Sequence, residues 1–462
     1  MRLSGSETAS ATNGYWSGAI PEVITGVATD TRDFESGQVF LALRGPSFDG
    51  HAFASTVAEQ AQALIGDHQG VSLWAGLDNS KLEVGDTLQA LGDIAHAWRI
   101  HLSATTIIAI SGSYGKTSLR SMLETGFAAM GFKVAATRAN FNNLVGVPQT
   151  LLRIPVDADI AVVECGISEC GEMARLAAMV QPDIAVLTGI TAAHSEGLGR
   201  LSGVVREKAL LLDSLNDGGW CALGQDVAAL MRENHIAVPE QALAVDDAHD
   251  DNSYETEVVR WQLDDCELTL AYQGQYHHVT LALPARHWAE NFAFTASIML
   301  RFLHDRECLY TLPDVANALA GWQPLAGRMH RCEGKNGMLV LDDSYNANPV
   351  SMQAAIDTLR ALPGNRIAIL GDMAELGEVS ESAHAGLDIN GLNCVYLIGR
   401  QMQVLAEKHA EARWFSTTEE ALSVLTNASF VVGDTVLVKA SRSMALETVV
   451  TLLCSGEVAN AL

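Results

Sequence analysis

Apolar residues along this chain gather in short runs of strand length, and amphipathic stretches of helix length separate them. Residues 105–110 are apolar, rich in β-branched side chains and followed closely by glycine, which is typical of a buried parallel strand. Further strands are predicted at 160–164 and 184–188, and helices at 117–130 and 172–179. Strands that alternate with helices in this way predict a parallel α/β sheet.

After Pro324 the alternation starts again and predicts a second, Rossmann-like sheet. Its strands are predicted at 338–341, 366–370, 395–398 and 435–438, and its helices at 349–361 and 381–386. The opening loop lacks the G-x-G-x-x-G pattern, so the sequence does not indicate a dinucleotide. Ahead of this sheet, the segments predicted as antiparallel strands are 258–263, 267–272 and 278–283.

The first hundred residues form a block of their own, with short strands predicted at 39–43 and 63–65 and a helix at 87–99. A chain of 462 residues is too long for one ordinary core. We therefore predict an α/β protein with three domains. These are a small α/β N-terminal domain at 1–103, a central parallel-sheet domain with a phosphate loop at 104–325, and a C-terminal Rossmann-like domain at 326–462.

Composition and charge narrow the classes of partner. The net charge of −26 repels polyanions, so we expect no nucleic-acid partner. No apolar run reaches the length of a membrane span and the N-terminus has no hydrophobic signal region, so we expect a cytoplasmic protein. The eight cysteines form no CxxC pair, and we interpret Cys165 and Cys170 as buried free thiols.

The strongest chemical signal is the segment 111–117, Ser-Gly-Ser-Tyr-Gly-Lys-Thr, between a predicted strand and a predicted helix. Backbone N–H groups and the positive end of a helix point at a phosphate chain from this position. Gly112 and Gly115 allow close approach, Lys116 meets the β and γ phosphates, and Thr117 binds Mg²⁺. Ile110 stands where the longer form of the motif has glycine, so the loop is a shortened variant. The alternative is a tight turn with an incidental lysine.

Further motifs lie before and after this loop, in a fixed order along nearly the whole chain. They are 29–32 (TDTR), 49–51 (DGH), 140–148 (NFNNLVGVP), 164–166 (ECG), 193–197 (AHSEG), 327–328 (GR), 342–349 (DDSYNANP), 371–377 (GDMAELG) and 441–443 (SRS). In this order they resemble the motifs of the Mur ligase family. The resemblance implies an ATP-dependent, ADP-forming ligase of peptidoglycan precursor synthesis that activates a carboxylate as an acyl phosphate and joins it to an amine.

The same resemblance implies the substrates and the roles of the domains. The N-terminal domain would bind a UDP-linked sugar peptide, the central domain ATP and Mg²⁺, and the C-terminal domain would present a dipeptide. The protein would be a monomer with small-molecule substrates. The residues implied to bind substrate are Thr31, Arg32, Asn142, Asn143, Tyr345, Asn346 and Asn348. Asn348 precedes Pro349 and is also expected to cap a helix.

For the catalytic centre, the resemblance implies Mg²⁺ ligation by Thr117, Glu164 and His194. A carboxylate at the end of a buried strand, such as Glu164, favours a hard cation with oxygen ligands. Lys208 would be carbamylated, although a lone lysine on a helix is most often a solvated side chain. The set implied to act in catalysis is Lys116, His194, Lys208 and Arg328. The set implied to bind ATP is Gly112, Ser113, Gly115, Lys116, Thr117, Ser118, Asn291, Arg328 and Asp342.

Some positions depart from the family pattern, notably Ala285 and Trp288, which replace a glycine and an asparagine ahead of Asn291. Two other functions are therefore kept open. One is a paralogous ligase that couples a different amine to a different carboxylate. The other is a phosphate-loop ATPase that acts as a conformational switch or binding module and forms no amide.

Overall fold

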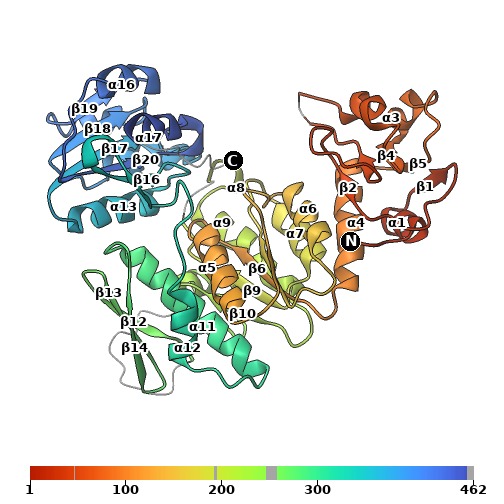
Figure 1. Ribbon diagram of the computed structural model, residues 1–462, viewed down its shortest axis with the longest axis horizontal. Coiled ribbons are helices and arrows are strands. Elements are labelled where there is room, and N and C mark those ends of the chain that lie inside the picture. Colours follow the sequence, from red (N-terminus) through yellow and green to blue (C-terminus); the bar gives the residue numbers. More distant parts are fainter. Residues whose placement is uncertain (46, 192–194, 246–256, 455–462) are drawn as a thin grey trace. The chain divides into compact units, whose positions relative to one another are not determined.

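The computed structural model describes residues 1–45, 47–191, 195–245 and 257–454 (Figure 1). These residues form two compact units. The first comprises Met1–Ser111, Gly131–Val186 and Glu207–Cys221, and the second comprises Gly112–Met130, Leu187–Arg206 and Ala222–Leu462. The boundaries of the three predicted domains differ from this division and stay a prediction. Within the described residues, no helix has the length and apolar character that a membrane crossing requires.

The N-terminal part of the first unit is a five-stranded sheet in the order β1-β5-β4-β3-β2. Strands β2 to β5 run parallel, and β1 pairs with β5 in the antiparallel sense. Phe40, Leu64 and Trp74 belong to its core. The elements are α1 (Gly5–Thr12), β1 (Tyr15–Ser17), β2 (Val27–Ala28), β3 (Val39–Leu41), α2 (Ala54–Val57), β4 (Ala63–Asp67), α3 (His68–Leu73), β5 (Lys81–Val84) and α4 (Thr87–His101).

A six-stranded sheet in the order β11-β10-β9-β6-β8-β7 follows. Its strands β6 and β8 pair in parallel register, with Ile110 opposite Glu164, and residues 107–110 of β6 and 160–163 of β8 are all apolar. The elements are β6 (Thr106–Ser111), α5 (Lys116–Ala129), β7 (Val134–Ala136), α6 (Gly146–Arg153), β8 (Ile160–Glu164), α7 (Glu172–Val180), β9 (Ile184–Leu187), α8 (Ser195–Leu198), α9 (Leu201–Ala209), β10 (Trp220–Leu223), α10 (Val227–Glu233) and β11 (Leu243–Ala244).

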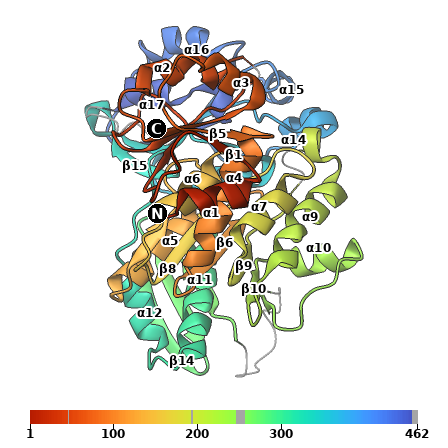
Figure 2. The ribbon, with the colours of Figure 1, turned by 90° about the vertical axis from the view of Figure 1, so that its right-hand side faces the viewer.

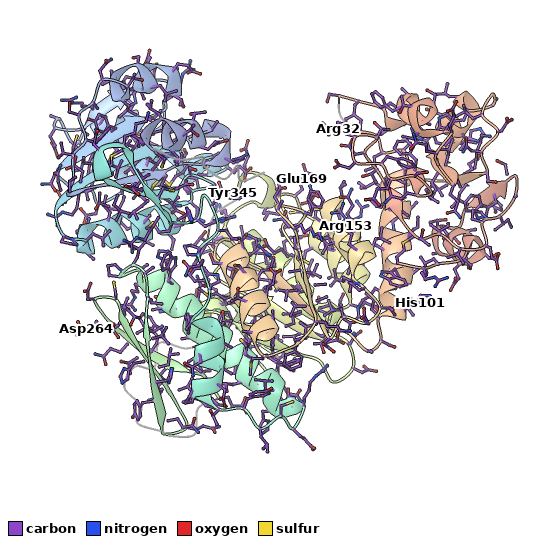
Figure 3. The ribbon with its side chains drawn as sticks, viewed as in Figure 1. Arg32, His101, Arg153, Glu169, Asp264 and Tyr345 are labelled. Carbon is purple, nitrogen blue, oxygen red and sulfur yellow. The ribbon has the colours of Figure 1, made fainter. Side chains whose placement is uncertain are left out.

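Three antiparallel strands, β12 (Arg260–Asp264), β13 (Glu267–Tyr272) and β14 (Gln275–Thr280), form a separate sheet in the second unit. Asp264 lies at the end of β12 (Figure 3). Helices α11 (Arg286–Asp305) and α12 (Leu312–Leu319) lie beside these strands (Figures 1 and 2). The antiparallel arrangement confirms the prediction, but the third strand begins at Gln275 rather than at 278. The turn at Gln273 and Gly274, both with positive φ, places the reversal earlier than the alternation suggests.

The C-terminal sheet has the order β15-β16-β20-β17-β18-β19, and only β15 pairs antiparallel to its neighbour. Val340, Ile369 and Val438 belong to its core. The elements are β15 (His330–Glu333), β16 (Leu339–Asp343), α13 (Pro349–Ala361), β17 (Asn365–Gly371), α14 (Ser380–Ala385), β18 (Cys394–Ile398), α15 (Gln403–Ala406), β19 (Arg413–Phe415), α16 (Thr418–Leu425), β20 (Asp434–Lys439) and α17 (Glu447–Leu453). The predicted α/β class with two parallel sheets is confirmed.

The N-terminus of helix α4, in the first unit, provides a test of helix capping. Its N-cap is Asp86, whose side chain accepts a hydrogen bond from the backbone N–H of Gln89 at 2.7 Å. We expect Asp86→Ala to destabilise the first turn by about 1 kcal/mol because this N–H loses its partner. Hydrogen exchange of the Gln89 amide should become several-fold faster. Asp86→Asn keeps a capping oxygen and should exchange like the unchanged protein; equal acceleration in both variants would contradict the capping role.

Candidate active site

The predicted phosphate loop lies between β6 and α5. β6 ends at Ser111, and α5 begins at Lys116 with Gly115 as its N-cap in the left-handed region, at φ 81°. The Nζ of Lys116 donates a hydrogen bond to the carbonyl of Gly112 at 2.6 Å. Backbone N–H groups at a helix start with a lysine beside them form an arrangement that binds phosphate.

The loop packs against the segment that follows β9. The N–H of Ser113 donates to the carbonyl of Gly189 at 2.7 Å, and the hydroxyl of Thr188 donates to the carbonyl of Tyr114. A Cβ atom on Gly112 would lie 1.9 Å from Oγ1 of Thr188. Position 112 therefore has room for glycine only, and this close approach sets the path of the loop.

Arg328 precedes β15 and reaches the first turn of α5. Its Nη2 donates to Oγ1 of Thr117 at 3.2 Å. The centre of its guanidinium lies 4.1 Å from the ring centroid of Tyr345, which Figure 3 labels, within the range of a cation–π interaction. The structure thus brings together Thr117, Arg328 and Tyr345, which belong to three separate motifs, although more than two hundred residues separate the first from the last.

A cavity of about 170 Å³ lies beside the loop. The residues predicted to bind ATP that line it are Ser113, Gly115, Ser118, Asn291 and Arg328. Asn291 belongs to α11, and its Oδ1 lies 3.3 Å from the position of a Cβ on Gly115. Predicted ATP-binding residues from separate elements therefore share one cavity.

Asp342, also predicted for the ATP site, bonds to backbone and to a neighbouring serine. Its buried carboxylate accepts hydrogen bonds from the N–H of Gly327 at 2.9 Å and from the N–H and hydroxyl of Ser344 at 3.1 and 2.6 Å. The next residue, Asp343, lines the cavity. Asp342 therefore orients the turn that carries Arg328, and Asp343 is a cavity residue that the sequence analysis missed.

Lys439 and His287 line the same cavity and were also missed. The Nζ of buried Lys439 lies 2.7 Å from Oδ2 of Asp343 and donates to the carbonyl of Asn346 at 2.9 Å. Burial lowers the pKa of His287 to about 4, against the opposing charge of Asp343, so the imidazole is neutral at pH 7. The position of Lys439 at the carboxyl end of a parallel strand is a signal that could have identified it.

Glu164 and Lys208 lie in the first unit, and both side chains are almost fully buried, at 1% exposure each. Cys165 follows Glu164 in the chain, and its pKa is raised to about 12 by burial and by the charge of Glu164, whereas the charge of Lys208 acts to lower it. Both charges therefore act on one thiol. Cys165 is buried as predicted, but the prediction for Cys170 was wrong, because this residue is exposed in the loop before α7.

His194, the third predicted Mg²⁺ ligand, lies outside the described residues. Thr117 and Glu164 offer oxygen donors, which Mg²⁺ prefers, and the burial of Glu164 fits a carboxylate that compensates a cation. Among the described residues, histidine, cysteine and acidic side chains form no cluster of three suited to a metal ion.

The predicted substrate residues of the first unit lie in two loops. Arg32, which Figure 3 labels, follows Thr31, and its guanidinium donates hydrogen bonds to the carboxylate of Asp30. The side chain of Arg32 is 86% exposed. The carbonyl of Asn142 accepts from the N–H of Gly166 at 2.7 Å. Oδ1 of Asn143 accepts from two backbone N–H groups at the start of α6, at 3.1 and 2.9 Å. Asn142 therefore lies beside the loop that follows Glu164.

Asn346 and Asn348 lie in the second unit, between β16 and α13. Asn348 is the N-cap of α13, as expected, and exchanges hydrogen bonds with Ser351. Its Nδ2 also donates to the carbonyl of Ser113 in the phosphate loop at 3.4 Å. The segment of Tyr345 and the asparagines therefore contacts the phosphate loop.

Comparison with known proteins agrees with this arrangement. Residues 23–99 match the Mur ligase family catalytic domain, residues 110–299 the Mur ligase middle domain, and residues 327–442 the Mur ligase glutamate ligase domain. The chain belongs to the Mur ligase family.

Within that family the chain is similar to UDP-N-acetylmuramoyl-tripeptide–D-alanyl-D-alanine ligases. It is 31% identical to that of Escherichia coli K12 over 92% of this chain and 93% of the relative, and 31% identical to that of Bacillus subtilis 168 over 93% of each. A crystal structure of MurF from Acinetobacter baumannii superimposes with a TM-score of 0.83 at 26% identity, over 98% of both chains. MurF ligase from Thermotoga maritima in complex with ADP shares the fold, with a TM-score of 0.77 over 92% of this chain and 96% of that one.

The phosphate loop generates a prediction with a matched control. We expect Gly112→Ala to abolish or strongly weaken ADP binding, because the new methyl group would collide with Thr188 and displace the loop. Isothermal titration calorimetry measures the effect. Gly131→Ala, just after α5, also places alanine at positive φ (92°) but meets no neighbouring atom, and should bind ADP normally. Similar losses in both variants would mean that backbone strain, not the contact with Thr188, is responsible.

Proposed function

We propose that this chain joins D-alanyl-D-alanine to UDP-N-acetylmuramoyl-tripeptide, at the expense of ATP, through an acyl phosphate. This is the reaction named by the curated relatives, and the chain matches them over more than nine tenths of its length. ATP and two small-molecule substrates are required, and the products are ADP, phosphate and an amide. The N-terminal domain (1–103) binds the UDP-linked substrate, the central domain (104–325) ATP, and the C-terminal domain (326–462) the dipeptide.

The observation that carries the proposal is the hydrogen bond from Arg328 to Thr117. It links the segment that enters the C-terminal sheet with the threonine of the phosphate loop, at 3.2 Å. A switch ATPase needs a phosphate loop, but it does not need a second substrate-presenting sheet tied to that loop. A guanidinium in this position stabilises the charge that develops on a transferring phosphoryl group.

The reaction then proceeds in two steps. The substrate carboxylate attacks the γ-phosphate of ATP, and Lys116 and Arg328 balance the charge on the phosphate oxygens as ADP leaves. The amine of the dipeptide next attacks the acyl carbon, and phosphate departs as the amide forms. Asn348, which bonds to the loop carbonyl of Ser113, helps to keep water from the acyl phosphate by holding the C-terminal segment against the loop. Mg²⁺, held by Thr117, Glu164 and His194, would neutralise charge on the phosphate oxygens.

The cellular setting follows from the substrates. ATP and a UDP-linked sugar peptide are cytoplasmic metabolites, so the enzyme would act there. One chain carries both the phosphate loop and the residues that reach it from the C-terminal sheet, so a monomer is sufficient for the reaction.

The proposal is tested by phosphate release from ATP with UDP-N-acetylmuramoyl-tripeptide, with and without D-alanyl-D-alanine, and by the mass of the product. We expect release that depends on the dipeptide and a product larger by one amide-linked dipeptide. Dependence on a different amine and acid would retain the ligase chemistry and change the pathway. Hydrolysis of ATP without any acceptor and without amide formation would establish the switch instead.

Arg328 provides the matched variant for this assay. Arg328→Ala should lower kcat by about 10³-fold or more, because a transition-state arginine contributes on that scale in phosphoryl transfer. Arg331→Ala removes a guanidinium three residues further along, in β15, where Nη1 of Arg331 donates to the exposed carbonyl of Ala282 at 2.8 Å, and should leave kcat close to that of the unchanged protein. Equal losses in the two variants would argue that the fold of the segment 328–331, rather than the charge of Arg328 at Thr117, is required for activity.

We also propose that Lys208 is carbamylated. Its side chain is 1% exposed and its charge acts on Cys165, immediately after Glu164. Addition of carbon dioxide would convert this buried cation into an anion with oxygen donors, which suit a hard cation.

Activity should therefore fall in buffer depleted of carbon dioxide and return when bicarbonate is added, and intact-protein mass should show one added carboxyl group on Lys208. Lys208→Arg keeps a positive charge that cannot form a stable carbamate, and should not respond to bicarbonate. Full activity without carbon dioxide would refute the modification while leaving the proposed ligase reaction intact.

A further inference from the structure

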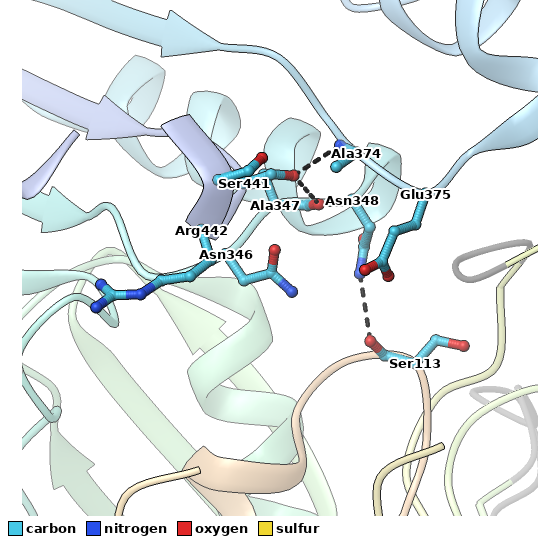
Figure 4. A pocket seen from close by; sticks show the side chains of 9 residues that line it. Ser113, Asn346, Ala347, Asn348, Ala374, Glu375, Ser441 and Arg442 are labelled. Carbon is cyan, nitrogen blue, oxygen red and sulfur yellow. Dashed lines mark hydrogen bonds between the residues drawn. The ribbon is translucent and has the colours of Figure 1, made fainter. Parts of the chain in front are cut away.

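A second cavity of about 160 Å³ lies next to the phosphate loop, and two of the motifs singled out in the sequence supply most of its wall. Figure 4 shows it. Its lining residues are Ser113, Asn346, Ala347, Asn348, Ala374, Glu375, Ser441, Arg442 and Ser443. Drug-sized ligands need roughly 300–1,000 Å³, so this cavity suits a small molecule.

Apart from Ser113, the wall consists of the loops that follow β16, β17 and β20. These strands are neighbours in the C-terminal sheet, in the order β16-β20-β17. Ligands of parallel α/β sheets bind at the carboxyl ends of the strands, where such loops converge. The position of the cavity is therefore that of a binding site.

A single hydroxyl holds the three loops together. Oγ of Ser441 accepts from the N–H of Ala374 at 2.8 Å and donates to the carbonyl of Ala347 at 3.2 Å (Figure 4). The N–H of Ser441 also donates to the carbonyl of Asp372 at 3.0 Å. The hydrogen bonds of Ser441 thus fix the positions of the three loops that form the cavity wall.

The lining includes one acidic and one basic side chain, Glu375 and Arg442. Figure 4 shows the carboxylate of Glu375 turned toward the space between Asn348 and Ser113, at the end of the cavity next to the phosphate loop. Glu375 has a φ of 63°, a left-handed conformation that is unfavourable for glutamate. Strained residues of this kind concentrate at binding and catalytic sites.

Arg442 also lines the cavity, and in Figure 4 its guanidinium points away from Glu375. Its guanidinium lies 5.7 Å from the ring centroid of Tyr345, whose ring also contacts Arg328, and pairs with Glu447 at 3.2 Å. That ion pair is about half exposed on both sides and therefore weak. Little free energy therefore opposes a change of partner when the guanidinium meets a stronger anion.

We propose that Arg442 and Glu375 hold the two charged ends of the incoming amine substrate, a small zwitterionic dipeptide, in this cavity. Arg442 binds the carboxylate, and Glu375 binds the ammonium group at the end that faces the phosphate loop. The nitrogen that attacks the acyl phosphate is thereby placed toward the loop before it loses its proton. This inference rests on the proposed ligase function.

The test is the steady-state KM for D-alanyl-D-alanine, with ATP and the UDP-linked substrate saturating. Arg442→Gln and Glu375→Gln should each raise this KM about tenfold or more, because each removes a charge-assisted hydrogen bond. The KM for ATP should stay within about twofold in both. An unchanged KM for the dipeptide in either variant would overturn the role of that residue, and a fall in kcat alone for Glu375→Gln would replace ammonium binding by a role in the chemical step.

A modified substrate measures how much the carboxylate of the dipeptide contributes to binding. D-alanyl-D-alaninamide lacks the carboxylate, so the unchanged enzyme should use it with a KM about tenfold or more higher. Arg442→Gln should show little further preference between the dipeptide and its amide. Additive losses from the amide and from Arg442→Gln would show that the two groups do not meet and would overturn the pairing.

Glu447→Gln is the matched control, because it frees Arg442 from its present partner without touching the cavity wall. Its KM for the dipeptide should be unchanged or lower; an increase like that of Arg442→Gln would mean that the ion pair has a structural role and would overturn the proposal. If the unchanged enzyme releases no phosphate in response to the dipeptide, the proposed function itself fails. If it does so but Arg442→Gln and Glu375→Gln keep the KM of the unchanged enzyme for the dipeptide, only the present inference fails.

Discussion

The carboxylate of Asp342 is the contact on which the geometry of the second unit depends. It is 3% exposed, and its two oxygens accept three hydrogen bonds, from the N–H of Gly327 and from the N–H and hydroxyl of Ser344. A buried carboxylate is costly unless its oxygens are paired in this way. Because Gly327 precedes Arg328 and Ser344 precedes Tyr345, one side chain holds both turns that carry the stacked arginine and tyrosine. The N–H of Tyr345 closes the arrangement on the carbonyl of Gly327 at 3.1 Å.

The contacts of Asp342 also determine where the side chains next to the phosphate loop lie. Arg328 lies between the ring of Tyr345 and the hydroxyl of Thr117, so its guanidinium is restrained from both sides. Asp343, on the other side of the pleat from Asp342, pairs with buried Lys439 and so ties β16 to β20 at their carboxyl ends. A buried ion pair of this kind adds little to stability compared with well-packed apolar residues, but it fixes which loops meet. The Asp343–Lys439 ion pair and the restrained guanidinium of Arg328 therefore determine how the C-terminal segments meet the phosphate loop.

Local patterns predicted the elements well, and contacts between distant segments were the part they could not supply. β8 and α13 begin and end where the sequence places them, because apolar runs and the Asn-Pro start of a helix act within a few residues. The phosphate loop was predicted for the same reason. The partners of Asp342 and the pairing of Asp343 with Lys439 were not, because nothing near Asp342 in the sequence indicates that its partner is Gly327. The prediction that Cys170 is buried was wrong because the sequence around a cysteine in a loop does not indicate whether the loop packs against the rest of the protein.

The departure of Trp288 from the family pattern is also explained by packing. The side chain is 2% exposed and meets Trp322 edge to face at a centroid distance of 5.4 Å. Trp322 in turn donates from its indole N–H to Oγ of Ser121 on α5, the helix that begins at the phosphate loop. Buried tryptophans stabilise such a junction when the indole N–H finds a partner. The replacement thus fastens α11 to α5 through apolar contact, and Asn291, one turn further along α11, keeps its place at the cavity beside Gly115. A polar residue lost at 288 is therefore compatible with an intact nucleotide cavity, since the position now sets the spacing of the two helices.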